Sequence, residues 1–370
     1  MGALGATVAS ALDGGDARSA ATQDWPPFVL VSGLLLVGLV AHDTGLFALA
    51  GRGLARMPGG AGVLFGGAVV LVASVTSILN LDTSVAFVTP VLVYAARSRG
   101  GGEAPLLYGC LLLSNAASLL LPGSNLTNLI VLGHLHLSGG RFLGRVAPAW
   151  VASVVITAAV VAVVERRSMT KNTDAVASRT TAPGGDRPGM AIAAAAVTAV
   201  TVCVLILPTP ALAVAAVGLV ATGARVVRGH ASSDRVLEVL GLPLLVGLFG
   251  VAVALGTLGR AWSAPATALA HLDSWATAAV AAAASVLVNN LPAASLLAAR
   301  VPHRPVALLV GLDIGPNLFV TGSLAWILWV RAAASAGAAP SIAKATRLGL
   351  MAAPLAMVGA LGVLTLAGTR

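Results

Sequence analysis

The sequence predicts an all-α polytopic membrane protein built from two inverted repeats, each with a re-entrant helical hairpin and a broken helix. Three observations predict this fold class. The 370 residues are 58% hydrophobic and only 9% charged, whereas a soluble domain carries about 25% charged residues. Polar and helix-breaking residues interrupt the apolar runs at four places. These interruptions come in the same order in two parts of the chain, which indicates repeated halves.

Charge and cysteine content exclude several other classes. The net charge is +9, but most basic residues lie in short loops between apolar segments, where they act as topology signals. Arg and Lys do not cluster with interleaved aromatic residues, so we expect no nucleic-acid partner. Cys110 and Cys203 lie inside apolar runs and are expected in the core, not in a disulfide or a metal site. The sequence therefore predicts no cofactor and no metal.

The first repeat is predicted at residues 26–164, after a flexible N-terminal tail at 1–25 that lacks the pattern of a signal peptide. A polar tip at Asn80-Leu81-Asp82-Thr83 separates two apolar arms. The second arm is too short to cross a bilayer comfortably, which indicates a re-entrant hairpin. In chain order we expect a span at 28–49, hairpin arms at 61–79 and 84–96, a helix over 105–138 broken at 121–128, and a span at 146–164.

The second repeat is predicted at residues 237–370. Before it come a basic segment rich in Ser, Thr, Pro and Gly at 165–189, which we expect to be a cytoplasmic linker, and a connecting helix pair at 190–236. The elements expected in the second repeat are a span at 237–258, a hairpin at 275–300 with its tip at Asn289-Asn290, a helix over 305–330 broken at its middle, and a span at 345–367.

If each hairpin returns to the side of the membrane from which it enters, the chain crosses the membrane eight times. If the N-terminus lies outside, most of the 22 Lys and Arg residues fall in cytoplasmic loops, which is the distribution that membrane proteins favour. The C-terminus is then also outside, and the two repeats have opposite orientations. Broken helices at corresponding places of two inverted halves are the best sequence indication of a secondary transporter with its site near the bilayer midplane.

Four polar elements are expected to converge on this site: the two hairpin tips and the two breaks. Their candidate binding residues are Asn80, Asp82 and Thr83 in the first tip, Ser124, Asn125, Thr127 and Asn128 in the first break, Asn289 and Asn290 in the second tip, and Asp313, Asn317, Thr321 and Ser323 in the second break. Half-helix N-termini suit anions or hydroxyl groups, whereas freed carbonyls and the two acids suit a cation or a proton.

Asp82 and Asp313 are the candidates for proton coupling or cation binding, because acids inside a membrane are costly and usually functional. The alternative is that each acid only caps a half-helix. For the Asn, Ser and Thr residues, the alternative is that they satisfy the backbone opened by a break. An intramembrane aspartyl hydrolase with these two acids as a dyad is a further alternative, but repeated Asn tips have no role in that chemistry. We therefore expect no enzyme activity.

At these motifs the chain resembles the arsenical pump membrane protein family. That family lies within a larger ion-transporter superfamily that also holds sodium/proton antiporters and di- and tricarboxylate carriers. The resemblance covers about residues 40–367. It is carried by Asn80-Leu81-Asp82-Thr83 with Thr89-Pro90, by Ser124-Asn125-Leu126-Thr127-Asn128, by Asn289-Asn290-Leu291-Pro292, and by the stretch from Gly311 to Ser323 with Leu324-Ala325.

The resemblance implies a transporter that exports arsenite or antimonite across the plasma membrane, driven by protons or by an ATPase. The sequence carries no Walker-type phosphate loop, so an ATPase would be a separate subunit. The arsenite pumps carry two more helices before the first repeat, matching 190–224 here; their absence bears on scaffold symmetry and on a homodimer contact. Sodium/proton antiport and small-carboxylate transport remain the alternatives. The Ser-Asn-Thr tips of the carboxylate carriers are absent here, which disfavours the second of these.

Overall fold

The computed structural model describes residues 7, 14–133, 135, 137–169 and 187–368, and every element in these ranges is a helix. The first is α2 (Gly14–Asp43), which contains Pro26 and Pro27. The prediction of a flexible tail at 1–25 is wrong for residues 14–25. Ala-rich sequence favours a helix there, and Ala17 and Ala20 are buried against neighbouring helices. The earlier residues of the predicted tail, apart from residue 7, lie outside the described ranges.

A separate helix, α3 (Leu46–Arg56), follows α2, although the sequence predicted one span over 28–49 and a loop after it. Gly45 at the junction has φ 84°, a conformation that glycine adopts without strain. Helix α3 places its apolar residues on one side and packs them against α6 (Thr89–Ser98). The predicted loop arginines, Arg52 and Arg56, are therefore helical.

The segment of the first predicted hairpin consists of several helical pieces. Helix α4 (Ala61–Ile78) leads to the short α5 (Leu81–Thr83), a π-helical turn η1 (Ser84–Val88) and then α6. The guanidinium group of Arg99, just after α6, donates to the carbonyls of Met57 and Gly59, just before α4. The two ends of this 57–99 segment therefore meet, with Asn80 at the opposite end.

The first broken helix consists of α7 (Ala104–Ala117), a 3-10 turn η2 (Pro122–Ser124) and α8 (Leu126–Leu132). The helix ends four residues before the predicted break. The long α9 (Gly139–Val164) and the short α10 (Arg166–Met169) follow, so α9 begins seven residues before the span predicted at 146–164 and includes Arg141 and Arg145. Most of the predicted linker, 170–186, lies outside the described residues, and its two ends are helical.

The elements at 242–366 follow the same order as those at 14–164: a long helix, a short helix, a segment with two helical arms, a broken helix and a long helix. Here the predicted boundary between the connecting pair and the second repeat falls inside a helix. The elements are α11 (Arg187–Ile206), α12 (Ala211–Val227), α13 (Ser233–Leu240), α14 (Leu242–Ala261), α15 (Ala264–His271), α16 (Ser274–Val288), α17 (Asn290–Leu297), α18 (Pro305–Ile314), η3 (Gly315–Leu318), α19 (Ala325–Ser335) and α20 (Ile342–Leu366).

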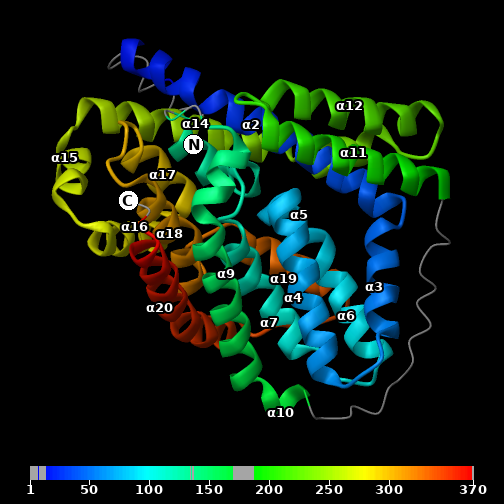
Figure 1. The fold of residues 1–370 in the computed structure, drawn as a ribbon. Coiled ribbons are helices and arrows are strands. Elements are labelled where there is room, and N and C mark those ends of the chain that lie inside the picture. Colours follow the sequence, from blue (N-terminus) through cyan, green and yellow to red (C-terminus); the bar gives the residue numbers. More distant parts are fainter. Residues whose placement is uncertain (1–6, 8–13, 134, 136, 170–186, 369–370) are drawn as a thin grey trace.

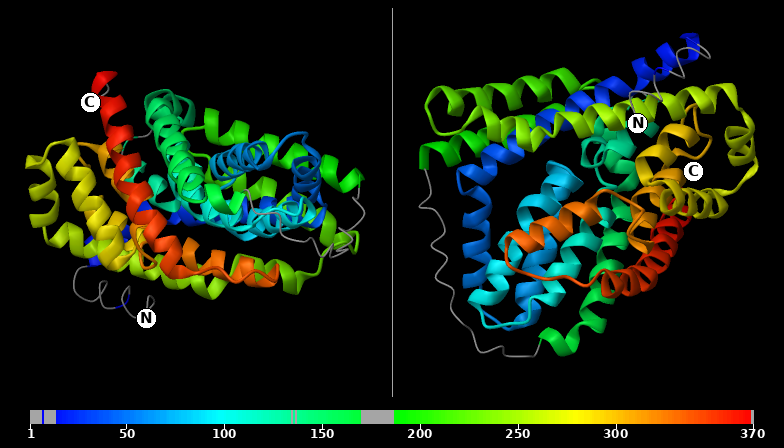
Figure 2. Two further views of the ribbon diagram at one scale, coloured as in Figure 1. Left: turned by 90° about the horizontal axis from the view of Figure 1, so that it is seen from below. Right: turned by 180° about the vertical axis from the view of Figure 1, so that it is seen from behind.

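Two groups of helices are visible in Figures 1 and 2. Helices α2, α11, α12 and α14 lie side by side and form what we call the panel. Gly33 of α2 and Gly218 of α12 pack backbone to backbone, since a Cβ atom on Gly218 would lie 2.6 Å from the Gly33 carbonyl oxygen. The other group, which we call the body, comprises α4–α9 and α16–α20. In it, α9 packs along α20 and the broken helices are buried.

Six helices of the described chain are long and apolar enough to cross a membrane: α2, α4, α9, α11, the α13–α14 pair and α20. Four shorter apolar helices accompany them, at Ala104–Ala117, Ala211–Val227, Ser274–Val288 and Pro305–Leu318. Two of these shorter helices are halves of the broken helices. The number and length of these apolar helices are consistent with a chain that crosses the membrane many times.

Candidate functional site

The two broken helices cross in the middle of the body, and Asp313 lies at one of their contacts. Its side chain is fully buried. Asp313 Oδ1 accepts hydrogen bonds from Asn125 Nδ2 at 2.9 Å and from Thr127 Oγ1 at 3.0 Å. Asp313 Oδ2 has no hydrogen-bond partner among the described residues. An acid from one break thus meets an amide and a hydroxyl from the other.

A second contact joins the same two helices with neutral groups. Asn115 Nδ2, on α7, donates to Asn317 Oδ1 at 2.9 Å, and Ser323 Oγ donates to Asn115 Oδ1 at 3.3 Å. Asn317 Nδ2 in turn donates to the Leu112 carbonyl at 2.9 Å. Asn115 was missed by the sequence analysis because no helix breaker adjoins it. The signal was the polar Ser114-Asn115 pair and Ser118 within an apolar run.

Two predicted residues of the first break satisfy opened backbone. Asn128 Nδ2 donates to the carbonyls of Ser118, at 2.7 Å, and Leu121, at 3.1 Å. Ser124 Oγ donates to the Ser77 carbonyl of α4 at 2.9 Å. Carbonyls freed by a break must find donors when they are buried. These bonds match the structural alternative for Asn128 and Ser124, although both residues border the Asp313 contact.

The first hairpin tip is closed on itself. Asn80 is 2% exposed, and its Oδ1 accepts a hydrogen bond from the Thr83 backbone N–H at 2.6 Å, which caps the short α5. Thr83 packs against Gly38 of the panel, where a Cβ atom would lie 2.6 Å from Thr83 Cγ2. Asp82 lies on the same turn and is partly exposed. It makes no hydrogen bond or ion pair with another predicted site residue in the described chain.

The second tip bonds directly to the second break. Asn289 is partly exposed and has φ 77° and ψ 150°, a conformation that residues other than glycine rarely adopt. Its Nδ2 donates to the Thr321 carbonyl at 3.1 Å, and the Asn290 backbone N–H donates to the Gly322 carbonyl at 2.9 Å. Thr321 Oγ1 donates to the Val286 carbonyl at 2.5 Å. The tip and the break therefore form one hydrogen-bonded unit.

The four polar elements contain acidic side chains and no basic ones. The sequence segments 61–96, 104–132, 274–298 and 305–330 contain only two charged side chains, and both are acids: Asp82 and Asp313. Amides, hydroxyls and backbone groups supply the remaining polarity. Among the described residues, no group of three or more His, Cys, Asp or Glu side chains could hold a metal ion. Such a site can bind a proton or a small cation together with a neutral polar solute.

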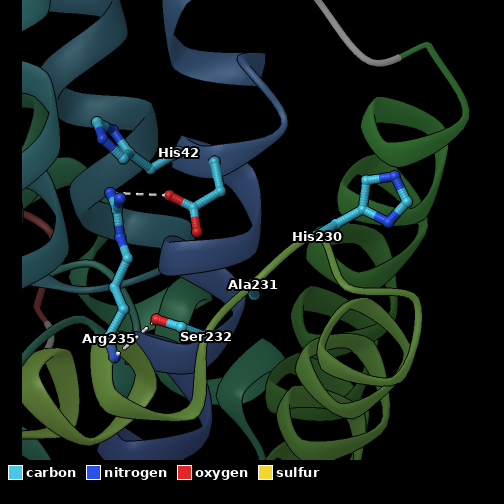
Figure 3. A pocket seen from close by; sticks show the side chains of 6 residues that line it. His42, His230, Ala231, Ser232 and Arg235 are labelled. Carbon is cyan, nitrogen blue, oxygen red and sulfur yellow. Dashed lines mark hydrogen bonds and ion pairs between the residues drawn. The ribbon is translucent and has the colours of Figure 1, made fainter.

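A separate surface cavity of about 370 Å³ lies where α2 meets α13, and none of the predicted site residues line it. Arg235, labelled in Figure 3, lines the cavity and forms an ion pair with Asp43 at 3.0 Å. His42, which also lines the cavity, stacks on Phe87 of η1 with ring centroids 4.8 Å apart. We assign this cavity to the junction of the panel with α13, away from the crossing of the broken helices.

Comparisons with known proteins agree with this architecture. The arsenical pump membrane protein of Escherichia coli strain K12 is 24% identical over 365 residues, covering 89% of this chain and 83% of that protein. The arsenical pump membrane protein of Yersinia enterocolitica is 23% identical over 337 residues, covering 83% and 78%. The crystal structure of the YdaH transporter of Alcanivorax borkumensis matches with a TM-score of 0.57 at 16% identity, covering 95% of this chain and 87% of that one.

The likeness to YdaH shows an all-helical, polytopic membrane transporter fold. The sequence matches to known transporters show that the chain is a multi-pass membrane transporter and not an enzyme, which confirms both of these predictions. The sequence profile of the citrate transporter family, CitMHS, matches residues 1–333. Because that match spans most of the chain, the protein belongs to the CitMHS citrate transporter family.

Proposed function

We propose that this transporter exports arsenite or antimonite across the plasma membrane in exchange for protons. One observation carries the proposal: the buried, half-paired carboxyl of Asp313 at the crossing of two broken helices that hold no cationic side chain. The trivalent hydroxides of arsenic and antimony are neutral at pH 7, so amides and hydroxyls are sufficient to bind them. The names of the distant relatives in Escherichia coli and Yersinia enterocolitica support the same substrate class.

A small carboxylate is the second candidate, because the matching family is described as citrate transporters. Electrostatics disfavour it. A polyanion would meet two acids and no Lys, Arg or His on the four polar elements, and only backbone N–H groups and amides would offset the repulsion. Sodium/proton antiport is the third candidate, since Asp313 with hydroxyl and amide neighbours also suits a small cation. In every case the transporter carries a solute, with H⁺ or Na⁺ as the coupling ion.

We further propose that the repeated order of elements reflects two inverted repeats with re-entrant hairpins, as expected at 26–164 and 237–370. Contacts between helix ends on the side assigned to the cytoplasm support this topology. Arg99 bonds to Met57 and Gly59, Arg97 to Ala336 and Gly337, and each contact joins residues that the charge distribution assigns to the cytoplasm. The excess of basic residues then favours both termini outside.

Transport by this arrangement would move the body against the panel. The two groups are built from separate helices and share contacts through α2, α11 and α14. We also propose two partners for the transporter: a second copy of the chain and a separate ATPase subunit. Size-exclusion chromatography with light scattering on the purified transporter tests the first, and ATP-independent transport in vesicles argues against the second.

The deciding experiment is uptake into inside-out vesicles from cells that lack their own arsenite pump. Radiolabelled arsenite, citrate and sodium are offered separately, each with and without an imposed pH gradient. The proposal expects arsenite accumulation that requires the gradient. Uptake of citrate or sodium without arsenite would replace it with one of the other candidates.

A further inference from the structure

One side chain of the panel joins four helices. Gln23, near the start of α2, donates from Nε2 to the Ile130 carbonyl of α8 at 3.3 Å and to the Ala298 carbonyl at the end of α17 at 3.2 Å. Its Oε1 accepts a hydrogen bond from Arg260 Nη2 of α14. The carboxamide therefore links two helices of the panel to the ends of two helices of the body.

The orientation of this amide is held by its surroundings. Arg260 also donates from Nη1 to the Gly256 carbonyl at 2.9 Å, and its charge is attracted by Asp24 and Asp16. With Arg260 on the oxygen of Gln23, both amide hydrogens are left for the two helix-end carbonyls. Arg300 donates to the Arg260 carbonyl at 2.7 Å, which ties the segment after α17 to the same point.

The two helices that Gln23 holds are the ones whose other ends carry the site. Asn125 and Thr127, the partners of Asp313, stand at the start of α8, and Asn289 and Asn290 stand at the start of α17. These helices have only 7 and 8 residues, so each is about 10 to 12 Å long. A displacement at Gln23 is therefore transmitted to the site through roughly two turns of helix.

The opposite end of the body is held differently. There Arg97, just before the end of α6, donates to the carbonyls of Ala336 at 2.8 Å and Gly337 at 2.9 Å and pairs with Glu103 at 2.9 Å. All of these residues lie within or beside the body helices. The ends of α6 and α19 are thus tied to each other, whereas the ends of α8 and α17 are tied to the panel.

We propose that Gln23, positioned by Arg260, is a latch that holds α8 and α17 against the panel in this conformation and releases them when the body moves. The inference rests on the proposed movement of the body against the panel, and it is independent of the transported solute. By the charge distribution, Gln23, Arg260 and Arg300 all lie on the outer side of the membrane. The latch would then close that side and open for release of the solute.

The test uses the isosteric substitution Gln23→Glu in the full chain, reconstituted in lipid nanodiscs. A carboxylate still accepts from Arg260 but cannot donate to the two carbonyls. Hydrogen–deuterium exchange should rise about two- to tenfold for each bond lost, in the segments 126–132 and 290–297, with α9 and α16 unchanged. Gln23→Leu, which removes all three bonds, should give at least the same rise. Thr22→Val is the control, because Thr22 is exposed and, among the described residues, its hydroxyl group bonds only to the Arg18 carbonyl within α2.

Unchanged exchange at α8 and α17 in both variants would overturn the latch, and so would a uniform rise throughout the protein, which would indicate a general packing role. Arsenite uptake, measured in parallel, should change in rate with Gln23→Glu and stay at the wild-type value with Thr22→Val. Exchange needs no substrate. A local rise in exchange without any arsenite transport by the wild type would therefore uphold the latch and refute the proposed substrate.

Discussion

The two contacts between the broken helices have the same construction and different chemistry. In one, Asp313 of α18 meets Asn125 and Thr127 of the other break. In the other, Asn115 of α7 meets Asn317 and Ser323. Each contact joins the first half of one broken helix to polar groups from the other, but only one contains an acid. The crossing of the two broken helices sets where polar groups meet, and the residue at each position decides whether a charge can be carried there.

Because only one contact contains an acid, we expect the two contacts to have separate roles. An isolated buried carboxylate is costly unless it is neutralised or fully hydrogen-bonded, and Asp313 Oδ2 has no partner in the described chain. The Asp313 contact is therefore suited to bind a proton or a cation reversibly. The Asn115 contact is fully hydrogen-bonded and suited to hold the crossing together. Substitutions at the Asp313 contact should affect transport, and substitutions at the Asn115 contact should affect the stability of the protein.

The largest effect is expected from Asp313→Asn. The amide keeps the shape of the side chain but carries no charge and binds no proton, so transport should fall at least about 100-fold, close to background. Uptake into vesicles, normalised to the amount of protein, measures it. Asp313→Glu serves as the matched variant and should retain part of the activity. Substantial transport by Asp313→Asn would show that the carboxyl is not the coupling group.

A comparably severe effect, on folding instead of transport chemistry, is expected from Gly349→Ala. A Cβ atom at Gly349 of α20 would overlap the Asn317 carbonyl oxygen, so the second contact could not form without displacement of backbone. Overpacking of this kind costs ~3 kcal/mol or more. Thermal unfolding of the purified protein in detergent should show a clear loss, whereas Gly362→Ala, with open space around it on the same helix, should show none.

An intermediate effect is expected from Asn125→Ala. It removes the 2.9 Å hydrogen bond to Asp313 and also the cap on the Thr127 backbone N–H at 3.3 Å. A hydrogen bond to a charged group contributes ~1.5–3 kcal/mol to the stability of the arrangement that it holds. Transport should therefore fall roughly tenfold or more. If uptake is unchanged while the melting temperature drops, Asn125 has only a structural role at the break.

The smallest of these effects on transport is expected from Asn115→Ala. It leaves Asn317 Oδ1 and Ser323 Oγ without their partner, which costs ~1–3 kcal/mol of stability. Transport per folded molecule should stay within about threefold of the wild type. Loss of transport with an unchanged melting temperature would contradict the assignment and give the second contact a role in solute binding.

The sequence predicted the breaks and tips because helix breakers and amides are conspicuous in apolar runs. Gly123-Ser124, Gly315-Pro316 and Asn289-Asn290 all lie where helices end or restart. It also predicted that the four polar elements would converge, and the 2.9 Å hydrogen bond between Asn125 and Asp313 joins two of them, the two breaks. Asp82 was expected on one of the converging elements, but it makes no hydrogen bond or ion pair with the other candidates in the described chain.

The remainder could not be read from local pattern, because it depends on which helices become neighbours. Asn115 lies within α7, before the break, and its importance appears only when η3 meets α7. Gln23 belongs to a segment expected to be a flexible tail; its role depends on the distant carbonyls of Ile130 and Ala298. Hydropathy indicates that a segment is apolar or polar, and it does not indicate which partner will bury it.

The most direct test of the account is proton movement linked to arsenite transport. The purified protein is reconstituted into liposomes that contain a pH-sensitive dye and hold a pH gradient. Arsenite added to the side equivalent to the cytoplasm should discharge the gradient with the wild-type protein and leave it intact with Asp313→Asn. A gradient unaffected by arsenite, or discharged equally by both proteins, would contradict proton-coupled export through Asp313.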